Sequence, residues 1–333
     1  MKRIGKVFLL LLVAEIIAVS STIIVNAQKA VSSDPNPLPA TKVVEDNSIQ
    51  NYKKISSLPE EKRRDFFIAA SAAQKAGLWR IHLALAVTKH PTLNKDQRAI
   101  LMEIAPLLTN ESFEKPSDNN SSKTALLQSI FQRSVAVFPR AFVAETFFRL
   151  GGSVEDIKLL EDFQSVSALL PSRKKAAFGD FSYKAQSDLW RLHLGMNLFY
   201  RSGSLNPAQK TIIFDLIEFA GPEIYEVVKI EPIRKTRIDE PMKAFAQRIS
   251  GAFSSRQEEA EEIFFTLGSK AWKGDNPEVP EDLDDSGRLC QCSSILSMCG
   301  LFNSSCSGDN CYINPFCGII YLMICDGVKC VAN

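Results

Sequence analysis

The chain has 333 residues, of which 45% are hydrophobic, and its 39 basic and 38 acidic residues leave a net charge of +1. Its basic residues are spread along the sequence, which excludes a protein that binds nucleic acid through a concentrated basic surface. All eight cysteines lie at or after Cys290. The chain therefore divides into a long part without cysteine and a short cysteine-rich part.

Residues 1–27 have the pattern of an export signal. An apolar run at 7–14 follows basic residues, and small residues precede Gln28. The basic residues are Lys2, Arg3 and Lys6. We expect a signal peptide cleaved after Ala27 and a secreted or cell-envelope protein. An uncleaved membrane anchor is the alternative, since a second apolar stretch runs from Ile16 to Val25.

Residues 28–42 predict a spacer, because three prolines within 34–39 stiffen the chain and disfavour regular structure. The folded part is expected to begin at residue 43.

An internal repeat follows the spacer. The sequence Leu-Trp-Arg-Ile-His-Leu at 78–83 returns as Leu-Trp-Arg-Leu-His-Leu at 189–194, and further short matches keep the same order with small insertions. The matches pair 44–46 with 154–156, 58–59 with 170–171, 93–94 with 205–206, and 147–151 with 264–268. We expect two domains of ordinary size, repeat 1 at 43–152 and repeat 2 at 153–269.

Helix signals dominate both predicted repeats. Asn94 with Gln97, and Asn206 with Gln209, have the spacing of capping boxes, in which each side chain bonds the other residue's backbone amide. The apolar residues behind them recur at helical spacing. Gly151 and Gly268 stand where helices are expected to end in a left-handed turn. The predicted fold is a tandem of all-α bundles.

The repeated Trp-Arg-x-His-Leu motif is the one candidate for chemistry in the bundles. It contains Trp79 and His82 in the first copy and Trp190 and His193 in the second. A structural role is favoured, with the histidine packing or bonding a nearby carbonyl. A nucleophile paired with the histidines stays open as an alternative. No cysteine or His-x-x-x-His accompanies them, so we expect no metal, no cofactor and no enzymatic activity.

Residues 270–289 predict an exposed linker, since acidic residues and two prolines keep the chain extended. Arg288 and Leu289 stand directly before Cys290 and mark a candidate processing site for a protease. A double-glycine leader site after residue 152 or 269 is a rival interpretation, but a helix C-terminus explains those glycines without a protease.

Residues 290–333 predict a small module held by disulfides, because so short a chain buries too little apolar surface to fold unaided. The cysteines are Cys290, Cys292, Cys299, Cys306, Cys311, Cys317, Cys325 and Cys330. Their pairing stays open. A zinc cluster is disfavoured, because the sequence has no Cys-x-x-Cys and export leads to an oxidising compartment. The apolar run at 319–324 is expected to form a buried strand.

The cysteine pattern resembles a known family. Cys290-Gln291-Cys292-Ser293-Ser294, and Cys317-Gly318 before an aromatic residue, are similar to the fulvocin C bacteriocins and to precursors called fulvocin C-related. The resemblance covers the last 44 residues by motif, and more weakly the helical part, through Trp-containing helices followed by Leu-Asn-x-x-Gln. It implies a secreted antibacterial peptide with eight cysteines. The chain departs from the pattern near its end, where four residues separate Cys325 from Cys330.

Two functions remain after this step. The first is a secreted bacteriocin-like precursor whose helical repeats act as carrier, leader or self-protection. The second is an uncleaved cell-envelope binding or adhesion protein with a structural cysteine-rich module. An extracellular enzyme ranks third. The module has few charges, so its expected partner is a protein of the bacterial envelope, or lipid entered by apolar surface. A processing protease is a further expected partner.

Overall fold

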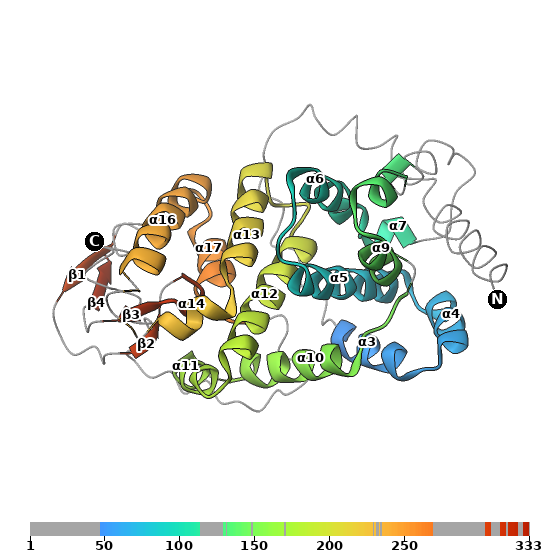
Figure 1. Ribbon diagram of the computed structural model, residues 1–333, viewed down its shortest axis with the longest axis horizontal. Helices are drawn as coiled ribbons and strands as arrows, with labels where there is room; N and C mark the ends of the chain where they lie inside the picture. The colour runs from blue at the N-terminus through green and yellow to red at the C-terminus, as the bar shows by residue number, and fades with distance from the viewer. Residues whose placement is uncertain are drawn as a thin grey trace. The chain divides into compact units, whose positions relative to one another are not determined.

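The computed structural model describes residues 47–113, 129–130, 132–147, 149–169, 171–228, 230, 233 and 235–268, and the short segments 304–307, 314–317, 319–325 and 329–332 (Figure 1). The predicted signal peptide, spacer and linker, with Arg288 and Leu289, lie outside these residues. So do four cysteines and the side chains of the other four. The described residues fall into two compact units, the first lying within 1–86, 92–157 and 199–203, and the second within 87–91, 158–198 and 204–333.

The first unit is built from helices. They are α3 (Ser48–Ser57), α4 (Glu60–Ala69), most of α5 (Ala72–Lys89), α6 (Lys95–Ile104), the 3-10 turn η1 (Ala105–Leu107), α7 (Asn110–Phe113) and α9 (Arg140–Phe147). Its core side chains include Ile55, Leu78 and Ile81, which are fully buried.

The second unit is also helical between residues 158 and 268. Its elements are most of α10 (Val154–Ser167), α11 (Pro171–Gly179), most of α12 (Tyr183–Tyr200), α13 (Pro207–Phe219), α14 (Pro222–Val227), the π-helical turn η2 (Lys235–Asp239), α16 (Glu240–Ala252) and α17 (Gln257–Phe264). No strand occurs among the described residues of 47–268, which confirms the all-α prediction for this part of the chain. No described helix combines the length and apolar character that crossing a membrane requires.

Both predicted capping boxes are confirmed. Asn94 Oδ1 accepts from the Gln97 amide at 3.0 Å, and Gln97 Oε1 accepts from the Asn94 amide at 2.9 Å. Asn206 and Gln209 make the same two bonds at the start of α13. Each glutamine also donates from Nε2 to a distant carbonyl, that of Val137 in the first unit and of Ala252 in the second. The cap therefore joins two segments as well as starting a helix.

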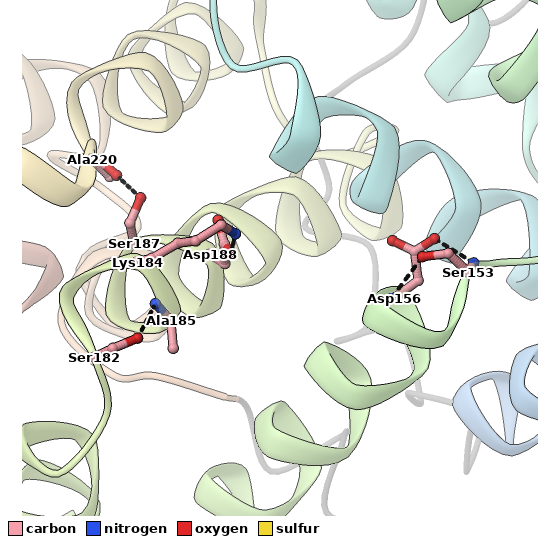
Figure 2. A network of polar contacts seen from close by, with 8 residues as sticks. All are labelled: Ser153, Asp156, Ser182, Lys184, Ala185, Ser187, Asp188 and Ala220. Atoms are coloured by element: carbon pink, nitrogen blue, oxygen red, sulfur yellow. Dashed lines mark hydrogen bonds and ion pairs between the residues drawn. The ribbon is translucent and has the colours of Figure 1, made fainter.

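Side-chain caps also fix α10 and α12, which carry residues of interest (Figure 2). Asp156 Oδ2 accepts from the Ser153 amide at 2.7 Å, and Ser153 Oγ accepts from the Asp156 amide at 3.2 Å. One turn into α12, the Ser187 hydroxyl donates to the Ala220 carbonyl at the end of α13. The first two bonds cap the start of α10, and the third joins α12 to the end of α13; all three satisfy backbone groups that helix ends leave unpaired.

The described residues of the C-terminal segment form two antiparallel strand pairs. β1 (Ser304–Ser307) pairs with β4 (Lys329–Ala332), and β2 (Asn314–Cys317) pairs with β3 (Met323–Cys325). The register sets Cys306 opposite Cys330. β2 lies against α11 of the second unit (Figure 1).

The strand predicted for residues 319–324 is only partly correct. Met323 and Ile324 belong to β3, but Ile319–Tyr321 is the 3-10 turn η5. Ile320 and Tyr321 have φ values of 44° and 57°, which an extended strand does not allow. The predicted burial is confirmed for residues 319–322, which are at most 3% exposed.

Candidate docking site for the C-terminal segment

His82, on α5, is held at both ring nitrogens. The Tyr52 hydroxyl lies 2.7 Å from Nδ1, and Nε2 lies 2.9 Å from the Glu145 carbonyl oxygen. A carbonyl only accepts, so the proton is assigned to Nε2, and Nδ1 accepts from Tyr52. The Trp79 ring meets the imidazole edge-on at 5.6 Å between centroids. A neutral histidine bonded in this way has no ring nitrogen left for a substrate.

His193, on α12, has a matching environment with a different donor. Its Nε2 lies 3.1 Å from the Ile263 carbonyl oxygen, while the Gly268 amide donates to Nδ1 at 3.1 Å. Phe163 stands at the position of Tyr52, tilted by the same 35° against the imidazole. Because phenylalanine has no hydroxyl, the backbone amide of Gly268 supplies the hydrogen bond that Tyr52 gives in the first unit.

The two glycines of the predicted repeats have positive φ, 117° at Gly151 and 76° at Gly268, as expected, although both stand four residues beyond the end of a helix. A basic side chain holds the carbonyl before each glycine. Lys174 donates to Leu267 at 3.0 Å, and Arg63 lies 3.5 Å from the Leu150 oxygen. Sequence reasoning missed these two side chains, although they also stand 111 residues apart.

An aromatic cluster in the second unit receives a residue of the C-terminal segment. Tyr321 packs edge-on against Trp190 of α12 at 5.0 Å and against Phe178 of α11 at 5.3 Å between ring centroids. Tyr225 of α14 packs against Phe178 at 5.8 Å and donates from its hydroxyl to the Ile320 carbonyl at 3.3 Å. We call Phe178, Trp190 and Tyr225 the docking site and Ile319–Leu322 the docked segment.

Burial keeps the phenols of this site protonated. It raises the pKa of Tyr321 to about 12, with a backbone hydrogen bond to Leu267 acting in the opposite direction, and it also raises the pKa of Tyr225. A neutral phenol donates a hydrogen bond, which matches the bond from Tyr225 to the docked segment. The site is therefore mainly apolar, and its polar contacts include the bond from Tyr225 to Ile320 and the bond between Tyr321 and the Leu267 backbone.

The docked segment has a strained backbone. Ile320 is β-branched and adopts φ 44° and ψ 31°, and Tyr321 follows in the same left-handed region. Such residues cost of order 1–3 kcal/mol each. Burying an aliphatic or aromatic side chain returns about 1.5–3 kcal/mol, and this segment buries four. The left-handed conformation is thus stabilised by contact with the docking site.

The corresponding positions of the first unit form a more open cluster. Phe67 and Phe113 pack edge-on at 6.4 Å, but both rings are only half-buried. The Lys75 ammonium lies 5.7 Å from the Phe67 ring centroid. At the matching place of the second unit, buried Gln186 donates to the Phe178 carbonyl. Of the two aromatic clusters, the one in the second unit is the fully buried one.

The sequence motif therefore lies partly in this site. Trp190 contacts both Tyr321 and His193, whereas Trp79 and His82 belong to the first unit. Phe178 and Tyr225 were missed, because nothing in their local sequence marks them, and Tyr321 was noted only as the aromatic residue after Cys317-Gly318. No group of side chains suited to a metal ion occurs among the described residues. No protein-family model, curated protein or solved structure matches this chain.

Proposed function

We propose that this chain is a secreted, bacteriocin-like precursor similar to the fulvocin C-related group. The cysteine-rich module at 290–333 is the antibacterial effector, closed by disulfides, and the helical part is its carrier. The observation that carries the proposal is the burial of Ile319–Leu322 in the second unit. A carrier for the module is expected to bind it, and the helices bury this segment of the module. Two domains that are joined only by a linker are not expected to bury residues against each other.

Tandem duplication of the helical part belongs to the same proposal. The ion pair of Arg133 with Glu103 has a counterpart in Arg248 with Asp215, and both capping boxes recur with the same geometry. An ion pair and a capping box are different kinds of contact, and both recur at a nearly constant sequence offset. This recurrence supports two copies of one helical domain. The second copy then acquired the docking site.

The test is intact mass spectrometry of the exported protein and the culture fluid, with and without reduction, together with a growth-inhibition assay of each fraction. The proposal predicts a species starting near Leu289 that is about eight mass units lighter before reduction, because four bridges remove eight hydrogens. That species should inhibit growth of susceptible bacteria. A single full-length, inactive species would contradict the proposal.

The alternative is an uncleaved cell-envelope binding or adhesion protein. The docked segment also supports this reading, since a structural module is expected to pack against the rest of its chain. Fractionation separates the two, because the alternative predicts full-length protein bound to cells and no free module in the medium.

A further inference from the structure

We propose that cutting the linker does not release the cysteine-rich module. The helices of the second unit, within 158–198 and 204–268, keep it in a noncovalent complex, and the docked segment stays covered until a separate dissociation step. This inference rests on the proposed function in assuming that the linker is cut and that the module is the effector. It assigns the docking site a second role, in which the carrier keeps the effector latent after processing.

The distribution of the cysteines means that, after cutting, the module and the helical part can be held together only by noncovalent contacts. Every cysteine lies at or after Cys290, so no disulfide can join the module to the helical part. Once the chain is cut within 270–289, only side-chain packing and hydrogen bonds connect the two fragments. The stability of the complex therefore depends on the contacts that Ile319–Leu322 and β2 make with the helices.

Those contacts have the character of a binding hot spot. Four consecutive apolar residues are at most 3% exposed, and Tyr321 makes edge-on contacts with two aromatic rings. The affinity of protein interfaces comes mainly from a few buried aromatic anchors whose neighbouring contacts exclude water. The Tyr225 hydroxyl adds a directional bond to the segment's backbone.

Separation also exposes a surface that the complex covers. In a free module, Ile319–Leu322 would lose its contacts with Phe178, Trp190 and Tyr225 and would expose apolar surface that the complex covers. The segment is thus hidden while docked. An effector that acts through this run is inactive in the complex and active after it dissociates.

The experiment uses the full-length chain with a specific protease recognition sequence inserted in the acidic linker. After oxidation and cutting, size-exclusion chromatography in native buffer is expected to elute the 290–333 fragment together with the helical fragment. Tyr321→Ala is expected to weaken the complex roughly 100-fold or more, as for loss of a buried aromatic anchor. Tyr183→Ala is the matched control, because this tyrosine on α12 is 45% exposed.

A variant on the carrier side keeps the test valid if Tyr321→Ala disturbs the module itself. Tyr225→Phe preserves the ring but removes the bond to Ile320, and the fragments should separate roughly 2- to 10-fold faster. The inference is overturned if the wild-type fragment elutes alone, or if Tyr321→Ala is retained as well as wild type. If the wild-type fragment co-elutes with the helical fragment but shows no antibacterial activity after it is dissociated, only the proposed function is contradicted. A fragment that is free at once and inhibits growth contradicts only this inference.

Discussion

Replacing Phe178 with alanine tests the docking site against its own counterpart. Phe178 is fully buried and contacts the rings of Tyr225 and Tyr321. Phe67, which stands 111 residues earlier, is half-buried and has one such partner, Phe113. The same chemical change at the two positions therefore removes very different amounts of packing.

The expected cost follows from this difference. A fully buried phenylalanine loses about 3–5 kcal/mol on truncation to alanine, because its transfer free energy and the cavity left behind both count. The half-buried Phe67 should lose about 1–2 kcal/mol, since roughly half its surface already faces water. Phe178→Ala is thus predicted to cost about 1–4 kcal/mol more than Phe67→Ala.

Urea unfolding measures both variants. In a Trp272→Phe background, tryptophan fluorescence reports on Trp190 beside the docking site and on Trp79 in the first unit, and circular dichroism follows the helices as a second probe. Phe178→Ala should shift the transition seen through Trp190 to lower urea. The reasoning is refuted if Phe178→Ala costs no more than Phe67→Ala, because the aromatic cluster would then not be packed as described.

Three further predictions address separate features. Burial lowers the pKa of Lys175 to about 8. The unfolded chain therefore binds more protons than the folded chain between about pH 8 and 10.5, and stability should rise with pH from about 8 to 10. At higher pH, ionisation of the buried tyrosines in the unfolded chain should reverse the trend. Lys175→Met should abolish that rise and stabilise the protein at pH 7 by about 2–3 kcal/mol in chemical unfolding. Gly268→Ala should cost about 2 kcal/mol or more of stability, because φ at Gly268 is +76° and a Cβ there would lie 2.1 Å from the Ser167 hydroxyl oxygen. Gly203→Ala is the control and should leave the thermal unfolding midpoint unchanged, since no atom lies within 4 Å of a Cβ at that position. Peptide mapping of the oxidised protein should find Cys306 joined to Cys330, since their Cα atoms are direct partners in the antiparallel register.

Each of these predictions has a contrary result. A flat stability profile between pH 8 and 10 in the wild type would contradict the burial of the Lys175 ammonium. Equal stability of the two glycine variants would contradict the close approach at Gly268. Recovery of Cys306 in a bridge with any other cysteine would contradict the strand register.

The helical part could be predicted because its signals are local. Asn94 and Gln97 specify a capping box within four residues, and the apolar spacing behind them specifies a buried helix face. The docking site could not be predicted in this way. Trp190 and Tyr321 are 131 positions apart, and only the fold brings their rings together.

The conformation of the docked segment shows a second limit. Ile320 favours extended structure by its own propensity, so the apolar run predicts a strand. Tertiary contacts override that propensity, because burial in the aromatic cluster compensates for the left-handed backbone. The histidines show a similar limit, since the motif marks His193 but gives no sign that the amide of Gly268 is its donor.

The central claim is that the helices of the second unit hold the cysteine-rich module through Tyr321, and nuclear Overhauser spectroscopy tests it most directly. With tyrosine and tryptophan rings selectively labelled in the full-length oxidised chain, a cross-peak is expected between Tyr321 and Trp190, whose centroids lie 5.0 Å apart. Tyr321→Phe and Trp190→Phe assign it by its loss. No Tyr321 to Trp190 cross-peak in the folded protein would contradict the account.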